Sequence, residues 1–119
     1  MAKKIISAGH VCLDITPVFP KANLGGTIAN ILIPGKLLHM DGVDIHTGGS
    51  VANTGIALKQ LGNDVRLMGK VGNDEFGKML VSIAETYGAS GFVVDNKSNT
   101  SYSVVLAIPG IDRIFLHDS

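Results

Sequence analysis

The stretch Gly48–Gly77, with the sequence GGSVANTGIALKQLGNDVRLMGKVGNDEFG, decides the fold of this 119-residue chain. Apolar residues recur at helical spacing after Ser50, itself a typical N-cap, and Gly62 is placed to end that helix as the C′ residue. Val65–Val71 then predicts a strand, and Glu75–Tyr87 predicts a second helix with one apolar stripe. This order predicts βαβ units on a mostly parallel sheet.

The segments on either side of this stretch are typical of short strands. Lys4–Ala8 and Val11–Ile15 are expected to form one opening strand, with Gly9 as a break point. Thr27–Met40 alternates imperfectly around a Pro-Gly turn and predicts a hairpin. Further strands are expected at Val43–Thr47, Phe92–Asp95, Ser101–Ile108 and Arg113–His117. Because alternating hairpins do not fit a buried parallel sheet, they predict a separate small β layer.

The composition excludes several classes of function. Ten Lys and Arg residues balance ten Asp and Glu residues without a like-charged block, which argues against a partner that is nucleic acid or an anionic membrane. The length allows one domain, and no apolar run approaches the about 20 residues of a membrane span. The four histidines and the single cysteine lack metal-ligand spacing, so no metal site is expected. Cys12 is expected to be a buried, inert thiol in a cytoplasmic protein.

The start of the first predicted helix is a candidate binding site. Gly48 and Gly49 would let a ligand approach the backbone closely, and the free N–H groups of a helix N-terminus favour an anion or a hydroxyl. Asn53, one turn into the helix, offers a donor and an acceptor that suit a polyhydroxylated ligand. A tight turn followed by an ordinary first-turn asparagine explains the same residues without a ligand, and both interpretations stay open.

Asp14 lies at the end of the expected opening strand and is a second candidate. In open α/β sheets, ligands bind beyond the carboxyl ends of the strands, where a carboxylate can accept hydrogen bonds from substrate hydroxyls. The alternative is an exposed turn residue that caps nearby backbone.

The frame Gly72–Lys78 imitates a phosphate-binding loop between a strand and a helix. Met79, however, replaces the Ser or Thr that holds Mg²⁺ in such loops, and two carboxylates would face the phosphates. We therefore expect an ordinary strand-to-helix turn that Asn73 or Asp74 caps.

Three segments together resemble the ribokinase/PfkB family of carbohydrate kinases: Gly9–Asp14 (GHVCLD), Gly48–Gly62 and Gly69–Gly77. The resemblance covers the whole chain. It implies an α/β fold, a Rossmann-like three-layer α/β/α arrangement of the ribokinase type with a small β-sheet lid, incomplete here. Residues 1–16 and 48–99 would form the N-terminal part of the substrate-binding core, and residues 17–47 and 100–119 would form the lid.

The same resemblance implies roles for the candidate site residues. Asp14 matches the family's carboxylate that binds sugar hydroxyls. Gly48 and Gly49 match a di-glycine hinge that moves when the lid closes over the substrate. Asn53 matches an asparagine that hydrogen-bonds the sugar.

Two features of the match leave the sugar open. The lid aligns less closely with the family, and Tyr102, Val104 and Arg113 are its candidates to face the substrate. Where the family commonly has GKGAN, this chain has GSVAN at residues 49–53, so the lysine is missing. Fructose, 2-keto-3-deoxygluconate or another sugar therefore stays as open as ribose.

The resemblance also implies what lies outside this segment. Family members are more than twice as long, and their C-terminal part carries a Gly-Ala-Gly-Asp motif with the catalytic base, the ATP site and the Mg²⁺ ligands. We therefore expect an ATP-dependent sugar kinase of which this chain is the sugar-binding part, without catalytic residues and inactive alone. The alternative is a non-catalytic module that binds sugar or associates through uncovered strands such as Ser101–Ile108. A homodimer through the lid strands is compatible with both.

Overall fold

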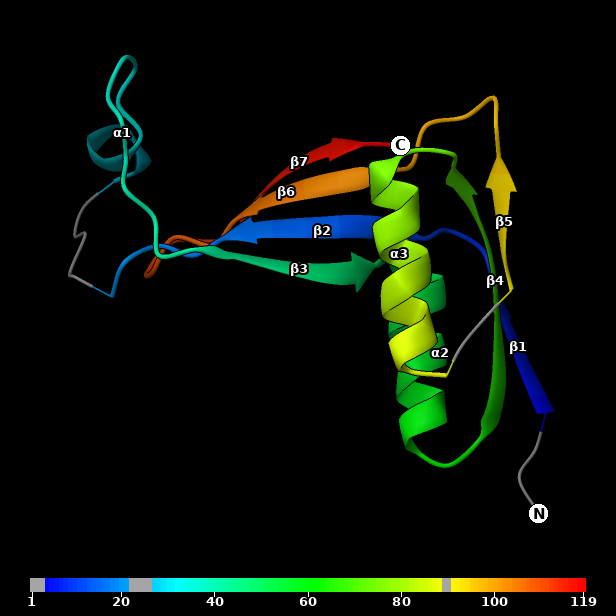
Figure 1. Cartoon of the computed structure of the whole chain (residues 1–119). Coiled ribbons are helices and arrows are strands. Elements are labelled where there is room, and N and C mark those ends of the chain that lie inside the picture. The colour runs from blue at the N-terminus through cyan, green and yellow to red at the C-terminus, as the bar shows by residue number, and fades with distance from the viewer. Residues whose placement is uncertain (1–3, 22–26, 89–90) are drawn as a thin grey trace.

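The computed structural model describes residues 4–21, 27–88 and 91–119, in which every helix is too short to cross a membrane. Its elements are, in chain order, β1 (Lys4–Ala8), β2 (Cys12–Pro17), α1 (Ile28–Ile31), β3 (Val43–Gly48), α2 (Gly49–Gln60), β4 (Asp64–Gly72), α3 (Glu75–Thr86), β5 (Phe92–Asp95), β6 (Tyr102–Leu106) and β7 (Ile114–Asp118). The Cα radius of gyration is 16.9 Å, above the about 13.5 Å of a compact domain of this length. The chain is extended because its two sheets run in different directions (Figure 1).

The first sheet is parallel, in the order β1-β4-β5, as the helix–strand–helix pattern predicts. Helices α2 and α3 cover one of its faces (Figure 1). Along β4, Val65 and Leu67 are buried beneath these helices, whereas Arg66 and Met68, which alternate with them, are exposed. We call β1, α2, β4, α3 and β5 the body. It supplies a sheet layer and a helix layer of the expected α/β/α fold.

The prediction of one opening strand is wrong. Gly9, with φ 143°, separates β1 from β2, and the two strands join different sheets. The N–H of Gly9 still donates to the carbonyl of Met68 in the body, and the chain then turns away through a backbone conformation that L-residues rarely adopt. Cys12–Pro17 pairs with β3 and β6, so it belongs to the second sheet, although residues up to 16 were expected in the core.

The second sheet has the order β3-β2-β6-β7, and we call these four strands the lid sheet. Pair β2–β6 is parallel, and the two outer pairs are antiparallel. The segment Ser101–Ile108, expected to be uncovered, contains β6, which is paired on both sides. The free edges of this sheet are therefore β3 and β7. Residues 22–26 of the expected lid segment lie outside the described residues.

Thr27–Met40 does not form the expected hairpin. Ile28–Ile31 makes the single-turn helix α1, and the Pro-Gly turn is present, with the N–H of Lys36 donating to the carbonyl of Ile33 at 3.1 Å, but no strands flank it. Leu37 is 91% exposed. The apolar runs here have no buried surface to pack against, so nothing stabilises their pairing.

Helix α2 begins earlier than predicted. Its N-cap is Gly48 rather than Ser50, and no side chain caps it. Instead, the N–H of Val51 donates to the backbone carbonyl of His10 at 3.2 Å. The β1–β2 connection thus satisfies one of the N–H groups that a helix N-terminus leaves without an intrahelical partner. At the other end Gly62, with φ 92°, is the expected C′ residue.

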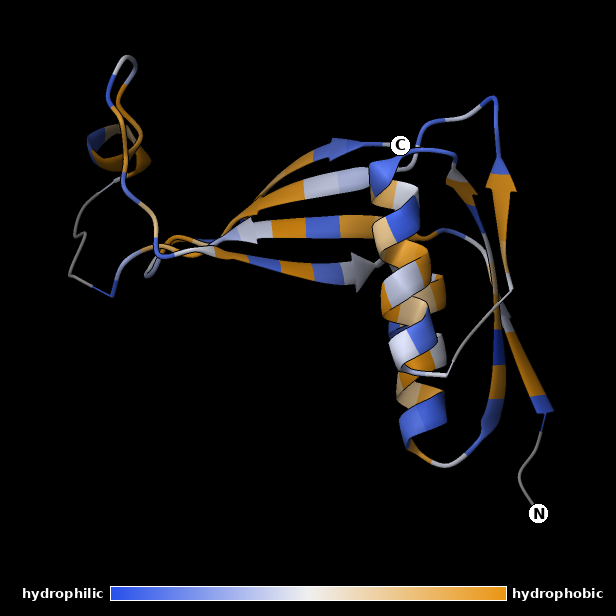
Figure 2. Cartoon of the chain, in the orientation of Figure 1, coloured by the Kyte–Doolittle hydropathy of each residue, from blue (hydrophilic) through white to orange (hydrophobic). Residues whose placement is uncertain are grey.

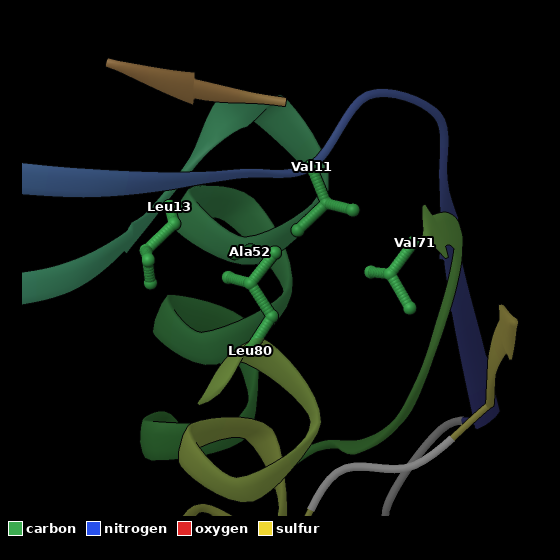
Figure 3. Packing of buried hydrophobic residues seen from close by; sticks show 5 residues of the cluster. All are labelled: Val11, Leu13, Ala52, Val71 and Leu80. Atoms are coloured by element: carbon green, nitrogen blue, oxygen red, sulfur yellow. The ribbon is translucent and has the colours of Figure 1, made fainter. Parts of the chain in front are cut away.

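One apolar cluster joins the lid sheet to the body. It consists of Val11, Leu13, Ala52, Val71 and Leu80, each at most 3% exposed (Figure 3). Apolar and polar residues alternate along β2 and β3 (Figure 2), so only one face of the lid sheet can join this cluster. Because Leu13 belongs to β2 and Leu80 to α3, side-chain packing as well as the chain connections attaches the base of the lid sheet to the body.

Candidate functional site

Asp14 of β2 and Gly48 at the end of β3 lie directly against each other. In the antiparallel register, Cys12 faces Gly48 and Asp14 faces His46. A Cβ atom on Gly48 would lie 2.5 Å from Oδ1 of Asp14, which is inside van der Waals contact. Only glycine therefore leaves room for this carboxylate, and the structure brings together two predicted site residues where the lid sheet meets α2.

Gly49 begins α2 in a conformation that favours glycine, with φ 85°. A Cβ atom on it would lie 2.6 Å from the carbonyl oxygen of His10. The same oxygen accepts the hydrogen bond from Val51, so that N–H of the helix N-terminus is not available to a ligand. Gly49 thus lets the β1–β2 connection cross the helix start closely, and the expectation of a wholly free helix N-terminus is wrong.

Asn53 lies apart from Asp14 and Gly48. Its side chain is exposed on α2 and lines a hollow of about 330 Å³ together with His46 and Thr47 of β3. Within the described ranges, no hydrogen bond joins Asn53 to Asp14. Of the four predicted residues, Asp14 and Gly48 therefore form a close pair, Gly49 follows Gly48 in the chain, and Asn53 faces a neighbouring hollow.

Cys12 is the hydrogen-bond partner of the Asp14 carboxylate. Its thiol is 5% exposed and donates to Oδ1 of Asp14 at 3.4 Å. Burial raises the pKa of Cys12 to about 11, and the negative charge of Asp14 acts in the same direction. The thiol is therefore protonated near neutral pH and acts as a donor. Alternation along β2 places both side chains on one face, a signal that the sequence contained.

Ser103 and His117 continue this polar face across the lid sheet. Ser103 pairs in register with Asp14, and His117 pairs with Ser103. Oγ of Ser103 lies 2.7 Å from Nδ1 of His117. Sequence reasoning missed both residues, because the neighbours of β6 cannot be known before the strands are paired.

The lid residues named from the sequence lie elsewhere. Tyr102 alternates to the opposite face of β6, where its ring packs edge-on against Phe76 of α3 with centroids 5.4 Å apart. Val104 shares that face by alternation, and Arg113 is exposed in the turn before β7. None of the three shares the strand face of Asp14.

The carboxylate of Asp74 occupies the turn before α3. Asp74 is the N-cap: its Oδ1 accepts from the N–H of Gly77 at 2.8 Å, and its Oδ2 accepts from the N–H of Thr100 at 2.9 Å. The hydroxyl of Thr100 also donates to Asp74, and this bond, followed by the backbone bond, lowers the pKa of Asp74 below its usual value. The expected capped turn is confirmed, with Asp74 as the cap.

A hollow of about 570 Å³ lies beyond the carboxyl ends of β1 and β4. Its lining includes His10, Lys70, Ser101 and Asp118. This end of an open α/β sheet is where ligands bind. The hollow adjoins the polar face of the lid sheet, because His10 packs edge-on against His117 with ring centroids 5.9 Å apart.

The described residues do not fit a bound Mg²⁺. In ranges 4–21, 27–88 and 91–119, no group of three or more His, Cys, Asp or Glu side chains is arranged to hold a metal ion. Kinases usually bind Mg²⁺ through one or two carboxylates together with the nucleotide phosphates, and no step through MgATP is assigned to these residues.

Comparison with known proteins identifies relatives over nearly the whole chain. The family model described as pfkB family carbohydrate kinase matches residues 2–116. Fructokinase-1 of Zea mays is 29% identical over 114 residues, covering 94% of this chain and 31% of that protein. The fructokinase of Solanum tuberosum is 30% identical over 114 residues, covering 94% of this chain and 32% of that protein. The chain thus spans about a third of the length of these relatives.

Solved structures show the same fold. A carbohydrate kinase from Agrobacterium tumefaciens superposes with a TM-score of 0.74 at 20% identity, covering 98% of this chain and 35% of that one. A fructokinase from Xylella fastidiosa, with bound ATP, gives a TM-score of 0.69 at 22% identity, covering 100% of this chain and 34% of that one. The described structure is therefore part of a ribokinase-like fold. Together with the match over residues 2–116, this shows that the chain belongs to the pfkB family of carbohydrate kinases.

Proposed function

We propose that this chain is the sugar-binding, lid-bearing part of an ATP-dependent carbohydrate kinase. The observation that carries the proposal is the contact between the Asp14 carboxylate and Gly48, where the lid sheet meets α2, in a chain of this family. An ionised carboxylate accepts strong hydrogen bonds from hydroxyl groups. Since Gly48 has no side chain, a sugar can reach the carboxylate beside the backbone.

The other predicted residues would complete the sugar site. Gly49, at the crossing of α2 and the β1–β2 connection, lies where a change of lid position would be absorbed. Asn53 would reach the sugar from α2 if the lid sheet moved toward the body, since its amide is exposed on the side of β3. Its donor and acceptor suit adjacent hydroxyls.

We infer that the reaction transfers the γ-phosphoryl group of ATP to a hydroxyl of a small sugar. Fructose is the first substrate to test, because the curated relatives at 29–30% identity are named fructokinases. ATP and Mg²⁺ would be held by the part of such proteins that this chain does not cover. The 119 residues alone, with no catalytic base assigned, are predicted to be inactive. The buried thiol of Cys12 favours a reducing, cytoplasmic location.

Homodimerisation through the lid sheet is part of this proposal. The edge strand β7 leaves Phe115 60% and Leu116 54% exposed, one on each face. An edge strand with exposed apolar residues can pair with a second copy. Sedimentation equilibrium should show a dimer that Phe115→Lys weakens; a monomer at all concentrations would remove the dimer and leave the sugar site untouched.

The sugar site is tested by titrating D-fructose into the protein and measuring its affinity calorimetrically. Asp14→Asn should weaken binding about 10- to 100-fold, the usual effect of losing a hydrogen bond to a charged group. Asp44→Asn is the matched control, because Asp44 also lies on the lid sheet, in register with Thr16, and is exposed.

The outcomes separate the possibilities. Equal affinity in the wild type and Asp14→Asn would contradict the role of Asp14. No binding of fructose, ribose or 2-keto-3-deoxygluconate would contradict the sugar site itself. The kinase assignment is checked separately, by ATP-dependent phosphorylation of the sugar by the full-length gene product.

A further inference from the structure

A row of polar side chains extends from Asp14 across the lid sheet, and we call it the lid row. It consists of Cys12 and Asp14 on β2, Ser103 on β6 and His117 on β7. Cys12 donates to Asp14 at 3.4 Å, and Ser103 bonds His117 at 2.7 Å. Because Asp14, Ser103 and His117 are in register on adjacent strands, these two hydrogen-bonded pairs lie side by side on one face of the lid sheet.

Two residues of the lid row are buried and two are accessible to a ligand. Cys12 and Ser103 are 5% and 6% exposed, so they face other protein atoms. Asp14 is half-buried and His117 is exposed, so these two can reach a ligand. Buried polar groups that are fully hydrogen-bonded hold their neighbours in fixed positions. The buried residues thus orient the two that face outward.

The imidazole of His117 is held from two sides. Ser103 bonds Nδ1, and the ring of His10 packs against it at an interplanar angle of 74°. When Ser103 donates to Nδ1, the neutral ring carries its proton on Nε2; in the protonated ring both nitrogens donate, and Ser103 accepts. Over the described part of the chain, no hydrogen bond uses Nε2. With Ser103 as the donor to Nδ1, His117 is therefore oriented to donate from Nε2.

We propose that His117 is a specificity-determining residue that donates from Nε2 to a second hydroxyl of the sugar bound by Asp14, and that Ser103 is its positioning residue. This rests on the proposed function. Strands are about 4.8 Å apart, so Asp14 and His117 stand about 10 Å apart at the backbone and their side chains can engage opposite parts of a small polyol. The hollow lined by His10 adjoins His117, because the rings of His10 and His117 pack edge-on with centroids 5.9 Å apart.

The test uses the full-length gene product with D-fructose and its monodeoxy analogues, one for each hydroxyl. The wild type should discriminate against two analogues, one for each contact. His117→Leu should raise KM for fructose about 3- to 10-fold and abolish discrimination against one analogue only, the effect of one lost hydrogen bond. Asp14→Asn should abolish discrimination against a different analogue. His117→Gln keeps an N–H donor and should restore much of the selectivity.

Two further variants separate contact from folding. Ser103→Ala leaves the imidazole present but unheld and should give a smaller loss of the same selectivity. Leu116→Ala is the matched control, because Leu116 neighbours His117 on β7, points to the opposite face and is 54% exposed. It should leave the analogue pattern unchanged.

The results distinguish this inference from the proposed function. If Asp14→Asn impairs sugar use while His117→Leu changes no KM, or raises every KM equally, the role of His117 is overturned and the sugar site stands. If the wild type neither binds nor phosphorylates any sugar, both fall together.

Discussion

The body and the lid sheet differ in what covers them. In the body, two helices bury alternate residues along β4, so that Val65 is 4% exposed and Leu67 1%. The lid sheet has helical cover at its base, where Leu13 is 0% exposed, whereas Phe115 on its edge strand is 60% exposed. The helices thus cover the body sheet along its length and the lid sheet at its base.

Two chain crossings reinforce that base. At the first, the β1–β2 connection passes over Gly49 at the start of α2. At the second, Thr100, just before β6, bonds Asp74 at the start of α3. Together with the cluster that contains Leu13 and Leu80, these crossings attach the base of the lid sheet to the body.

The largest expected effect tests whether the base of the lid sheet shares a core with the body. Leu13→Ala and Leu80→Ala each leave a cavity in the same cluster, and each should lower the free energy of unfolding by about 2–5 kcal/mol. Leu37→Ala, at 91% exposure, is the control and should change it by less than about 0.5 kcal/mol. Denaturant unfolding measures all three. A loss confined to Leu80→Ala would mean that the lid sheet folds independently of the body.

A smaller effect tests the crossing at α2. Gly49→Ala and Gly62→Ala both place a side chain at positive φ, but only the methyl group at Gly49 meets another atom, the His10 carbonyl. Gly49→Ala should therefore cost about 1–3 kcal/mol more than Gly62→Ala in the same unfolding assay, because the backbone must shift. Equal losses of unfolding free energy in the two variants would show that the close approach of Gly49 to His10 does not restrict the backbone there.

The smallest effect tests the crossing at α3. Removing the cap by Asp74→Ala should cost about 0.5–2 kcal/mol, and Asp74→Asn should cost less. Because the pKa of Asp74 is lowered in the folded state, its stabilisation is present above the ordinary carboxyl pKa, about 3.9, and is lost as pH falls through the lower folded value.

The matched control for this prediction is Glu75→Gln, since Glu75 is an exposed neighbour that pairs with Lys78 at 3.1 Å. The free energies of unfolding of the wild type and Asp74→Asn, measured between pH 7 and pH 2, should converge at low pH. A difference that stays constant over this range would contradict the linkage.

Much of the body could be predicted from local pattern. The apolar stripe of α3, its Asp74 cap and the short strand β5 lie where the sequence placed them, because helix periodicity and caps depend on neighbouring residues. The hairpin expected in Thr27–Met40 failed for the converse reason. Pairing there needed a surface to pack on, and local alternation carries no information about whether one exists.

The candidate site could be predicted only in part. Asp14, Gly48 and Gly49 stood out as a carboxylate and a glycine pair, and the structure shows the first two in contact. Ser103 and His117 did not stand out. Their link to Asp14 depends on β6 pairing with β2 rather than with another strand.

The helices and strands of the body, the turns at its glycines and the resemblance to a carbohydrate kinase family could all be read from the amino-acid order, because they rest on short-range spacing. That Cys12–Pro17 leaves the body for the lid sheet, and that Asp14, Ser103 and His117 share one face, followed from the folded chain alone. Alternation tells which residues of one strand lie together. Which strands become neighbours, and in which register, follows from the packing of segments far apart in the chain.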